Sequence, residues 1–180
     1  PATVQYAYDD MGRLASKTLG NGTTETMAYN IQGWLSEIDS RHFDMKLDYY
    51  ESDLVAATPY YSGNVSAWTW SLNGSYPKNY VFTYDRLGRL TDSHQYSGTS
   101  RLDNYVEHGI SYDRNGNIRT LKRTWGVMPV DDLFYEYEGN RLRYLTERAT
   151  ASGTTNDVYV PGPTARMGYS YDSNGNMTND

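Results

Sequence analysis

The chain has 180 residues, with 16 Lys and Arg against 22 Asp and Glu and a net charge of -6. This acidic balance argues against a nucleic-acid partner, because phosphate binding needs clustered Lys and Arg side chains, which the sequence lacks. The absence of cysteine excludes disulfides, zinc ribbons and thiol nucleophiles. No apolar run approaches the roughly 18 residues of a membrane-spanning helix, and residues 1–4 lack the basic and apolar regions of a signal peptide.

The aromatic composition predicts an all-β fold. The sequence holds 19 Tyr but only 3 Phe, and its mean hydropathy is -0.77. Tyrosine buries a large ring while its hydroxyl stays hydrated or hydrogen-bonded, which suits the half-buried surface of a sheet. The 16 Gly and the lack of a long segment with apolar residues at helical spacing predict few or no helices.

A short motif recurs along the chain: Tyr-Asp, two variable residues, Gly, a polar residue and an aliphatic one. In chain order its strict copies span residues 8–14, 84–90, 112–118 and 171–177. Their fixed members are Tyr8, Asp9 and Gly12; Tyr84, Asp85 and Gly88; Tyr112, Asp113 and Gly116; and Tyr171, Asp172 and Gly175. Two looser copies hold Tyr29 and Gly33, with Asn in place of Asp, and Tyr137 and Gly139, one residue shorter. A further degenerate unit is expected around residues 61–65.

Each motif predicts a β-hairpin. The Asp can accept hydrogen bonds from backbone N–H groups two and three residues on, and the Gly supplies a positive φ, as in a type I turn closed by a glycine bulge. The aliphatic residue then returns to the face of the tyrosine. We expect positive φ at Gly12, Gly33, Gly88, Gly116 and Gly175.

Further turns at residues 20–22 and 97–99 join the hairpins in series. The sequence therefore predicts an extended, twisted antiparallel sheet, with residues 1–180 forming one repeat array. Residues 36–80 are expected to form longer, less regular strands. The Thr, Ser, Gly and Pro content of residues 146–165 predicts a long hairpin loop.

These units resemble the YD repeats of the Rhs family, which occur in bacterial Rhs and wall-associated proteins, shell subunits of insecticidal toxin complexes and animal teneurins. The resemblance covers the chain from Tyr6 to Met177. It implies a β-ribbon that spirals into a hollow shell, in several members around a C-terminal effector, and a bacterial protein that is secreted or at the cell surface. The implied partners are the rest of the repeat chain and an enclosed effector. Members carry an Asp-Pro-x-Gly self-cleavage segment, which this chain lacks.

Because the last motif ends three residues before the C-terminus, we expect the chain to be a piece of a longer repeat protein. Such a piece has unpaired sheet edges and a partly uncovered tyrosine stripe, so it is expected to self-associate. The stripe comprises Tyr6, Tyr8, Phe82, Tyr84, Tyr135, Tyr137, Tyr169 and Tyr171.

The sequence offers few candidate residues for a metal site, a catalytic site or a cofactor site. His94 and His108 would lie near each other if residues 89–96 pair with 105–112, but no third ligand is fixed, so no metal site is predicted. Adjacent acids such as Asp131 and Asp132 point to opposite faces of a strand, unlike glycosidase pairs. Nucleophile-elbow, phosphate-loop and dinucleotide motifs are absent, and we predict neither an enzyme nor a bound cofactor.

Two functions remain open for the sequence. The first is a non-catalytic segment of a repeat shell. The second is a module that binds a cell-surface carbohydrate or protein through its Tyr and Trp face. Trp68 and Trp70 share one strand face and could stack on a glycan if exposed.

Overall fold

The computed structural model describes residues 3–54, 56–149 and 166–179. All regular secondary structure in these residues is β-strand, without helix, which confirms the predicted fold class. The chain divides into two compact units, one of residues 1–82 with 96–101 and the other of residues 83–95 with 102–180.

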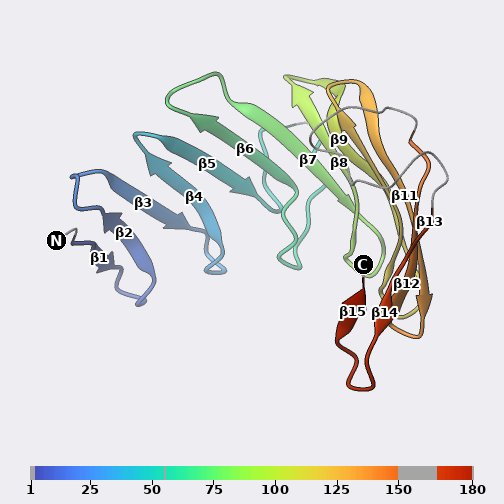
Figure 1. Ribbon diagram of the computed structural model, residues 1–180. Coiled ribbons are helices and arrows are strands. Elements are labelled where there is room, and N and C mark those ends of the chain that lie inside the picture. Colours follow the sequence, from blue (N-terminus) through green and yellow to red (C-terminus); the bar gives the residue numbers. More distant parts are fainter. Residues whose placement is uncertain (1–2, 55, 150–165, 180) are drawn as a thin grey trace. The chain divides into compact units, whose positions relative to one another are not determined.

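The first unit is built from antiparallel strands hydrogen-bonded in chain order (Figure 1). They are β1 (Gln5–Tyr8), β2 (Leu14–Thr18), β3 (Thr24–Tyr29), β4 (Leu35–Ser40), β5 (Phe43–Asp48), β6 (Ala67–Leu72) and β7 (Lys78–Tyr84), whose last two residues belong to the second unit. Strand order equal to chain order is the result of serial hairpins, because each tight turn pairs a strand with the one before it.

The strands of the second unit are also ordered in the sheet as they are in the chain. Its strands are β8 (Leu90–Ser97), β9 (Ser100–Tyr112), β10 (Ile118–Trp125), β11 (Met128–Glu138), β12 (Arg141–Glu147) and β13 (Arg166–Gly168), and the tip between β8 and β9 belongs to the first unit. A separate two-stranded sheet holds β14 (Ser170–Tyr171) and β15 (Met177–Asn179).

The motif tyrosines lie directly across from the aliphatic residues of the same motif, as predicted. Tyr8 pairs with Leu14, and Tyr112 pairs with Ile118. The same cross-strand pairing joins Tyr29 to Leu35, Tyr137 to Leu142 and Tyr171 to Met177. Each motif thus brings one aromatic and one aliphatic side chain together on one face of its hairpin.

The buried core differs between the units. In the first unit the buried hydrophobic residues are Tyr49, Ala67 and Val81, and in the second they are Val106, Ile110, Val130, Leu133 and Leu145. Most of the predicted tyrosine stripe is half-buried, but Tyr6 and Tyr8 are 55% and 64% exposed. With so few fully buried aliphatics, contacts between neighbouring hairpins become important for stability.

Two expectations about strand lengths are corrected. Residues 36–80 do not form longer strands: β4, β5 and β6 have six residues each, and residues 49–66 lie outside the strands. The loop expected from residue 146 begins later, because Thr146 and Glu147 continue β12 by pairing with Phe134 and Leu133. Residues 150–165 of that expected loop lie outside the described residues.

Candidate functional site

The motif turn is a closed hydrogen-bonded loop around the Asp side chain. In the first motif the Gly12 N–H donates to the Asp9 carbonyl (2.9 Å) and the Asp9 N–H donates to the Arg13 carbonyl (2.8 Å). The same pair of bonds closes the turns that begin at Asn30, Asp85, Asp113 and Asp172. The motif glycines at residues 12, 33, 88, 116 and 175 have φ between 75° and 90°, which confirms the predicted glycine bulge.

The Asp side chain bonds differently from the prediction. Asp9 Oδ1 accepts from the backbone N–H groups of Met11 (2.9 Å) and Arg13 (2.8 Å), which are two and four residues on. The N–H three residues on belongs to the glycine and donates to the Asp carbonyl instead, so the carboxylate reaches past it. The other motif turns repeat this arrangement.

The residue after the glycine is held by the second carboxylate oxygen. Arg13 Nε donates to Asp9 Oδ2 at 2.7 Å, and Arg89 Nε donates to Asp85 Oδ2 at 2.8 Å. Where the motif has Asn, its amide takes the same place, as in Asn117 Nδ2 to Asp113 Oδ2 at 2.9 Å. The Asp therefore orients a specific side chain as well as shaping the turn.

Each oriented Arg reaches the tyrosine of the next hairpin along the ladder. The Arg13 Cζ lies 4.6 Å from the centre of the Tyr29 ring, and the Tyr29 hydroxyl donates to the Leu14 carbonyl at 2.9 Å. We call this pair of contacts the clamp: an Arg over the next tyrosine, and that tyrosine's hydroxyl on the carbonyl of the aliphatic residue after the Arg.

Two more clamps lie in the second unit. Arg89 stacks on Tyr112 at 4.4 Å, and the Tyr112 hydroxyl donates to the Leu90 carbonyl at 2.7 Å. Arg141 stacks on Tyr171 at 5.8 Å, and the Tyr171 hydroxyl donates to the Leu142 carbonyl at 3.0 Å. A guanidinium over an aromatic face and a buried hydroxyl bond each stabilise by about 1 kcal/mol. The clamp joins hairpins that sequence analysis treated as separate units.

The Asn motif at residues 112–118 uses an amide contact for the same purpose. Asn115 and Asn117 both donate from Nδ2 to Asn140 Oδ1 of the next turn, at 3.0 and 3.1 Å. That turn is a two-residue hairpin loop in which Gly139 has φ +63°, as expected for glycine at the first position of a type II′ turn. Both motif types therefore direct the residue after the glycine toward the following hairpin.

A split copy of the motif replaces the degenerate unit expected around residues 61–65. Its tyrosine is Tyr49, whose hydroxyl donates to the Leu35 carbonyl at 2.8 Å. Trp34, in the position of the motif Arg, lies with its ring centre 5.0 Å from that of Tyr49. The glycine of this copy is Gly63, with φ +94°, and a Cβ built on it would lie 3.2 Å from the Trp34 ring. The segment 50–62 thus carries an insertion relative to the strict motifs, in which three residues separate the tyrosine from the glycine.

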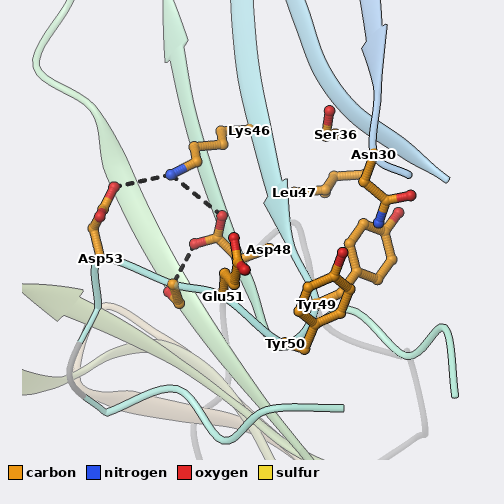
Figure 2. A pocket seen from close by; sticks show the side chains of 10 residues that line it. Asn30, Ser36, Lys46, Leu47, Asp48, Tyr49, Tyr50, Glu51 and Asp53 are labelled. Carbon is orange, nitrogen blue, oxygen red and sulfur yellow. Dashed lines mark hydrogen bonds and ion pairs between the residues drawn. The ribbon is translucent and has the colours of Figure 1, made fainter. Parts of the chain in front are cut away.

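A polar cleft of about 340 Å³ lies where this insertion leaves β5 (Figure 2). Lys46 Nζ contacts Asp53 Oδ2 at 2.9 Å and Asp48 Oδ1 at 3.4 Å. The Ser52 hydroxyl donates to Asp48 Oδ2 at 2.7 Å. The hydrogen bond that Lys46 donates to Asp53 raises the pKa of Lys46, whereas a catalytic amine needs a lowered pKa. The cluster therefore suits the anchoring of the insertion to β5 better than amine chemistry.

The electrostatics of the turns follow from their hydrogen bonds. Bonds from the Arg13 backbone lower the pKa of Asp9, and bonds from the Arg89 side chain lower the pKa of Asp85. The amides of Asn117 and Asn176 lower the pKa of Asp113 and Asp172 in the same way. Burial raises the pKa of Tyr49 and Tyr112. The turns are thus built around ionised carboxylates and neutral tyrosines.

We expect the chain to lose stability in acid. A carboxyl whose pKa is lowered by folding stabilises the fold above its unfolded pKa of about 3.9, and this contribution is lost as the pH falls through the lower folded pKa. Urea unfolding between pH 7 and pH 3 should show a midpoint that is steady down to about pH 5 and then declines. The decline should be smaller in Asp85→Asn; a midpoint that rises or stays level down to pH 3 would contradict the turn electrostatics.

The two histidines of the pair lie near each other, as the sequence predicted. The rings of His94 and His108 are 6.4 Å apart between centres. Across the residues that the structure describes, no group of three His, Asp or Glu side chains could hold a metal ion. In the same residues no helix could cross a membrane.

The two candidate glycan-stacking residues contact each other. The rings of Trp68 and Trp70 are 5.7 Å apart and stacked, with Lys78 Nζ 5.2 Å from the Trp70 ring and Tyr80 6.2 Å from Trp68. Both side chains are half-buried, and both indole N–H groups are buried without a hydrogen-bond partner. Glycan stacking at these residues stays a prediction, and the packing around them gives it no support.

Comparison with known proteins decides the fold. A chain in the crystal structure of TcdB2-TccC3-Cdc42 superposes with a TM-score of 0.68 at 14% sequence identity, covering 98% of this chain and 9% of that one. This chain has the fold of a TcdB2-TccC3 segment. No family model and no curated protein matches the sequence.

Two other TcdB2-TccC3-type structures align less closely. A TcdB2-TccC3 structure without its hypervariable C-terminal region aligns at a TM-score of 0.47 and 16% identity, over 96% of this chain and 6% of that one. A Photorhabdus luminescens Tc holotoxin pore aligns at 0.47 and 18%, over 98% and 6%. The TcdB2-TccC3 match agrees with the all-β fold of serial hairpins that the YD-repeat motifs predict.

Proposed function

We propose that this chain is a non-catalytic structural segment of an Rhs-type repeat shell, which in the parent protein encloses or presents a C-terminal effector. The clamp is the observation that carries this proposal. In each of the four strict motifs the Asp bonds to its own turn and to the following Arg or Asn, and the clamp tyrosines bond to the preceding hairpin. Side chains that would have to be free for catalysis are thus engaged in holding successive hairpins together.

The same contacts support treating residues 1–180 as one repeat array. The clamp from Arg13 to Tyr29 lies in the first unit, and those to Tyr112 and Tyr171 lie in the second. An array stabilised by nearest-neighbour contacts extends by adding further copies of one hairpin, which suits a large enclosing wall. The resemblance of the motifs to YD repeats also supports a place outside the producing cell, secreted or at its surface.

Limited proteolysis of the parent protein tests enclosure. We expect the region after this segment to resist protease in the intact protein and to become cleavable when the clamp is weakened by Tyr112→Ala. Tyr76, which is 95% exposed, provides the control, since Tyr76→Ala should leave the protection unchanged. Equal digestion of the downstream region in the intact parent and as an isolated piece would refute enclosure.

Self-association of the isolated chain remains part of this proposal. Tyr6 and Tyr8 expose more than half of their surface on β1, so they are available to pack against a second copy. Light scattering on the purified chain tests it: a mass above that of one chain supports the idea, and a persistent monomer at high concentration overturns it.

A further inference from the structure

A cleft of about 380 Å³ lies in the second unit near the turn that joins β10 and β11. It takes no part in the clamp, and none of its residues belongs to a motif. The lining residues are Tyr105, Val106, Glu107, Arg123, Thr124, Trp125 and Val130. Its volume and its mixture of aromatic and charged side chains are typical of small-ligand sites.

Two half-exposed aromatic rings form a corner of the cleft. The Tyr105 and Trp125 ring centres are 5.2 Å apart and the planes meet at 86°. The side chains are 44% and 46% exposed, so each ring keeps surface available to solvent. Elsewhere in the chain, Trp68 and Trp70 stack on each other and are less exposed to solvent than Trp125. The Trp125 corner is therefore the better surface for stacking a ligand.

The backbone is distorted to hold this corner. Tyr105 has φ +53°, a left-handed conformation that costs a bulky residue about 1–2 kcal/mol. The Tyr105 N–H donates to the Gly126 carbonyl at 3.0 Å, and the Val106 N–H donates to Thr124 Oγ1 at 2.9 Å. The pairing of β10 with β11 also shifts register between Arg123 and Thr124. Such bulges redirect side chains at sites of binding.

Charged groups lie beside the aromatic corner. Arg123 Nε contacts Asp131 Oδ2 at 2.5 Å, and the Asp131 side chain is fully buried. Glu107 lies opposite Arg123 across strands β9 and β10 and is exposed. The cleft therefore offers the Glu107 carboxylate as an acceptor and the Arg123 guanidinium as a donor, without the excess of positive charge that a phosphate ligand needs.

We propose that this cleft binds a neutral pyranose sugar, with a C–H face of the ring stacked on Trp125 and its hydroxyl groups bonded to Glu107 and Arg123. An aromatic face covers the apolar side of a sugar, and paired donors and acceptors satisfy its hydroxyls. A protein-docking patch is less consistent with the cleft, because Glu is depleted at protein interfaces, whereas Glu107 lines this cleft.

Nuclear magnetic resonance on the full chain tests the proposal. The probes are the methyl glycosides of glucose, galactose, mannose and N-acetylglucosamine, titrated while the indole N–H signals of the 4 Trp residues are followed. At least one glycoside should shift the Trp125 signal in a saturable way. We expect Glu107→Gln to weaken that binding about tenfold, which corresponds to about 1.4 kcal/mol. Trp70→Phe should leave it unchanged.

A second variant separates stacking from folding. Trp125→Phe keeps an aromatic ring and should retain weakened binding, whereas Trp125→Ala should abolish it while the circular dichroism spectrum and thermal midpoint show a folded chain. No saturable shift with any glycoside, or shifts that centre on Trp68 and Trp70, would overturn the proposal. Binding of an apolar dye that depends on Trp125, without any sugar effect, would overturn it in favour of a protein-docking patch.

Discussion

Replacing Tyr112 with Ala is expected to lower the free energy of unfolding by about 2–3 kcal/mol. The substitution removes a half-buried ring, the face on which Arg89 stacks at 4.4 Å, and the hydroxyl that donates to the Leu90 carbonyl at 2.7 Å. Tyr112→Phe removes the hydroxyl alone and should cost about 1 kcal/mol. Urea denaturation of the 180-residue chain measures both differences.

The matched control is Tyr76, a tyrosine outside the motifs with 95% of its surface exposed. Tyr76→Ala should change the free energy of unfolding by less than about 0.5 kcal/mol. If Tyr112→Ala and Tyr76→Ala have the same effect, the motif tyrosine does not join successive hairpins and the clamp has no energetic role.

The second large effect is expected at Gly63, where two costs combine. Its φ of +94° disfavours any residue with a Cβ by about 1 kcal/mol. An added Cβ would also lie 3.2 Å from Trp34 Cζ2, and such overpacking costs about 1–3 kcal/mol. We therefore expect Gly63→Ala to lower the free energy of unfolding by about 3 kcal/mol, measured by urea denaturation.

A substitution at Gly116 measures the energetic cost of the positive φ alone. Its φ is +90°, but nothing lies within 4 Å of the Cβ that an alanine would add. Gly116→Ala should therefore cost only about 1 kcal/mol. If Gly63→Ala and Gly116→Ala lower the free energy of unfolding equally, the Trp34 ring moves aside at no energetic cost. The split motif around residues 50–62 would then lose its support.

Local features of the fold were predictable from the sequence because they depend on few neighbouring residues. An Asp four positions before an Arg or Asn, with a Gly between them, sets the turn, the positive φ and the return of the aliphatic side chain. Those features appear at Gly12, Gly88 and Gly116. The pairing of Tyr112 with Ile118 follows from the same turn length.

The contacts between hairpins were not predictable by this reasoning. The stacking of Arg89 on Tyr112 joins residues 23 positions apart, through strands whose lengths vary from one repeat to the next. The split motif was missed because 13 residues separate Tyr49 from Gly63, whereas three residues separate the tyrosine and the glycine of a strict motif. A signal was present in the sequence: each clamp Arg directly precedes the aliphatic residue of its motif, as in Arg13-Leu14, Arg89-Leu90 and Arg141-Leu142.

The cleft near Trp125 also lay beyond sequence reasoning. Sequence analysis favoured Trp68 and Trp70 because two Trp at alternate positions must share a strand face. It could not show that they would stack on each other. Nor could it show that a left-handed Tyr105 would lie beside Trp125.

The most direct test of the account is a double-mutant cycle on Arg89 and Tyr112. Unfolding free energies are measured for the unmodified chain, Arg89→Ala, Tyr112→Ala and the double variant. The clamp predicts a coupling free energy of at least about 1 kcal/mol between these two residues. The same cycle with Arg86, an exposed arginine in the same turn, should give a coupling near zero. A coupling for Arg89 and Tyr112 no larger than that for Arg86 and Tyr112 would contradict the claim that motif side chains hold successive hairpins together.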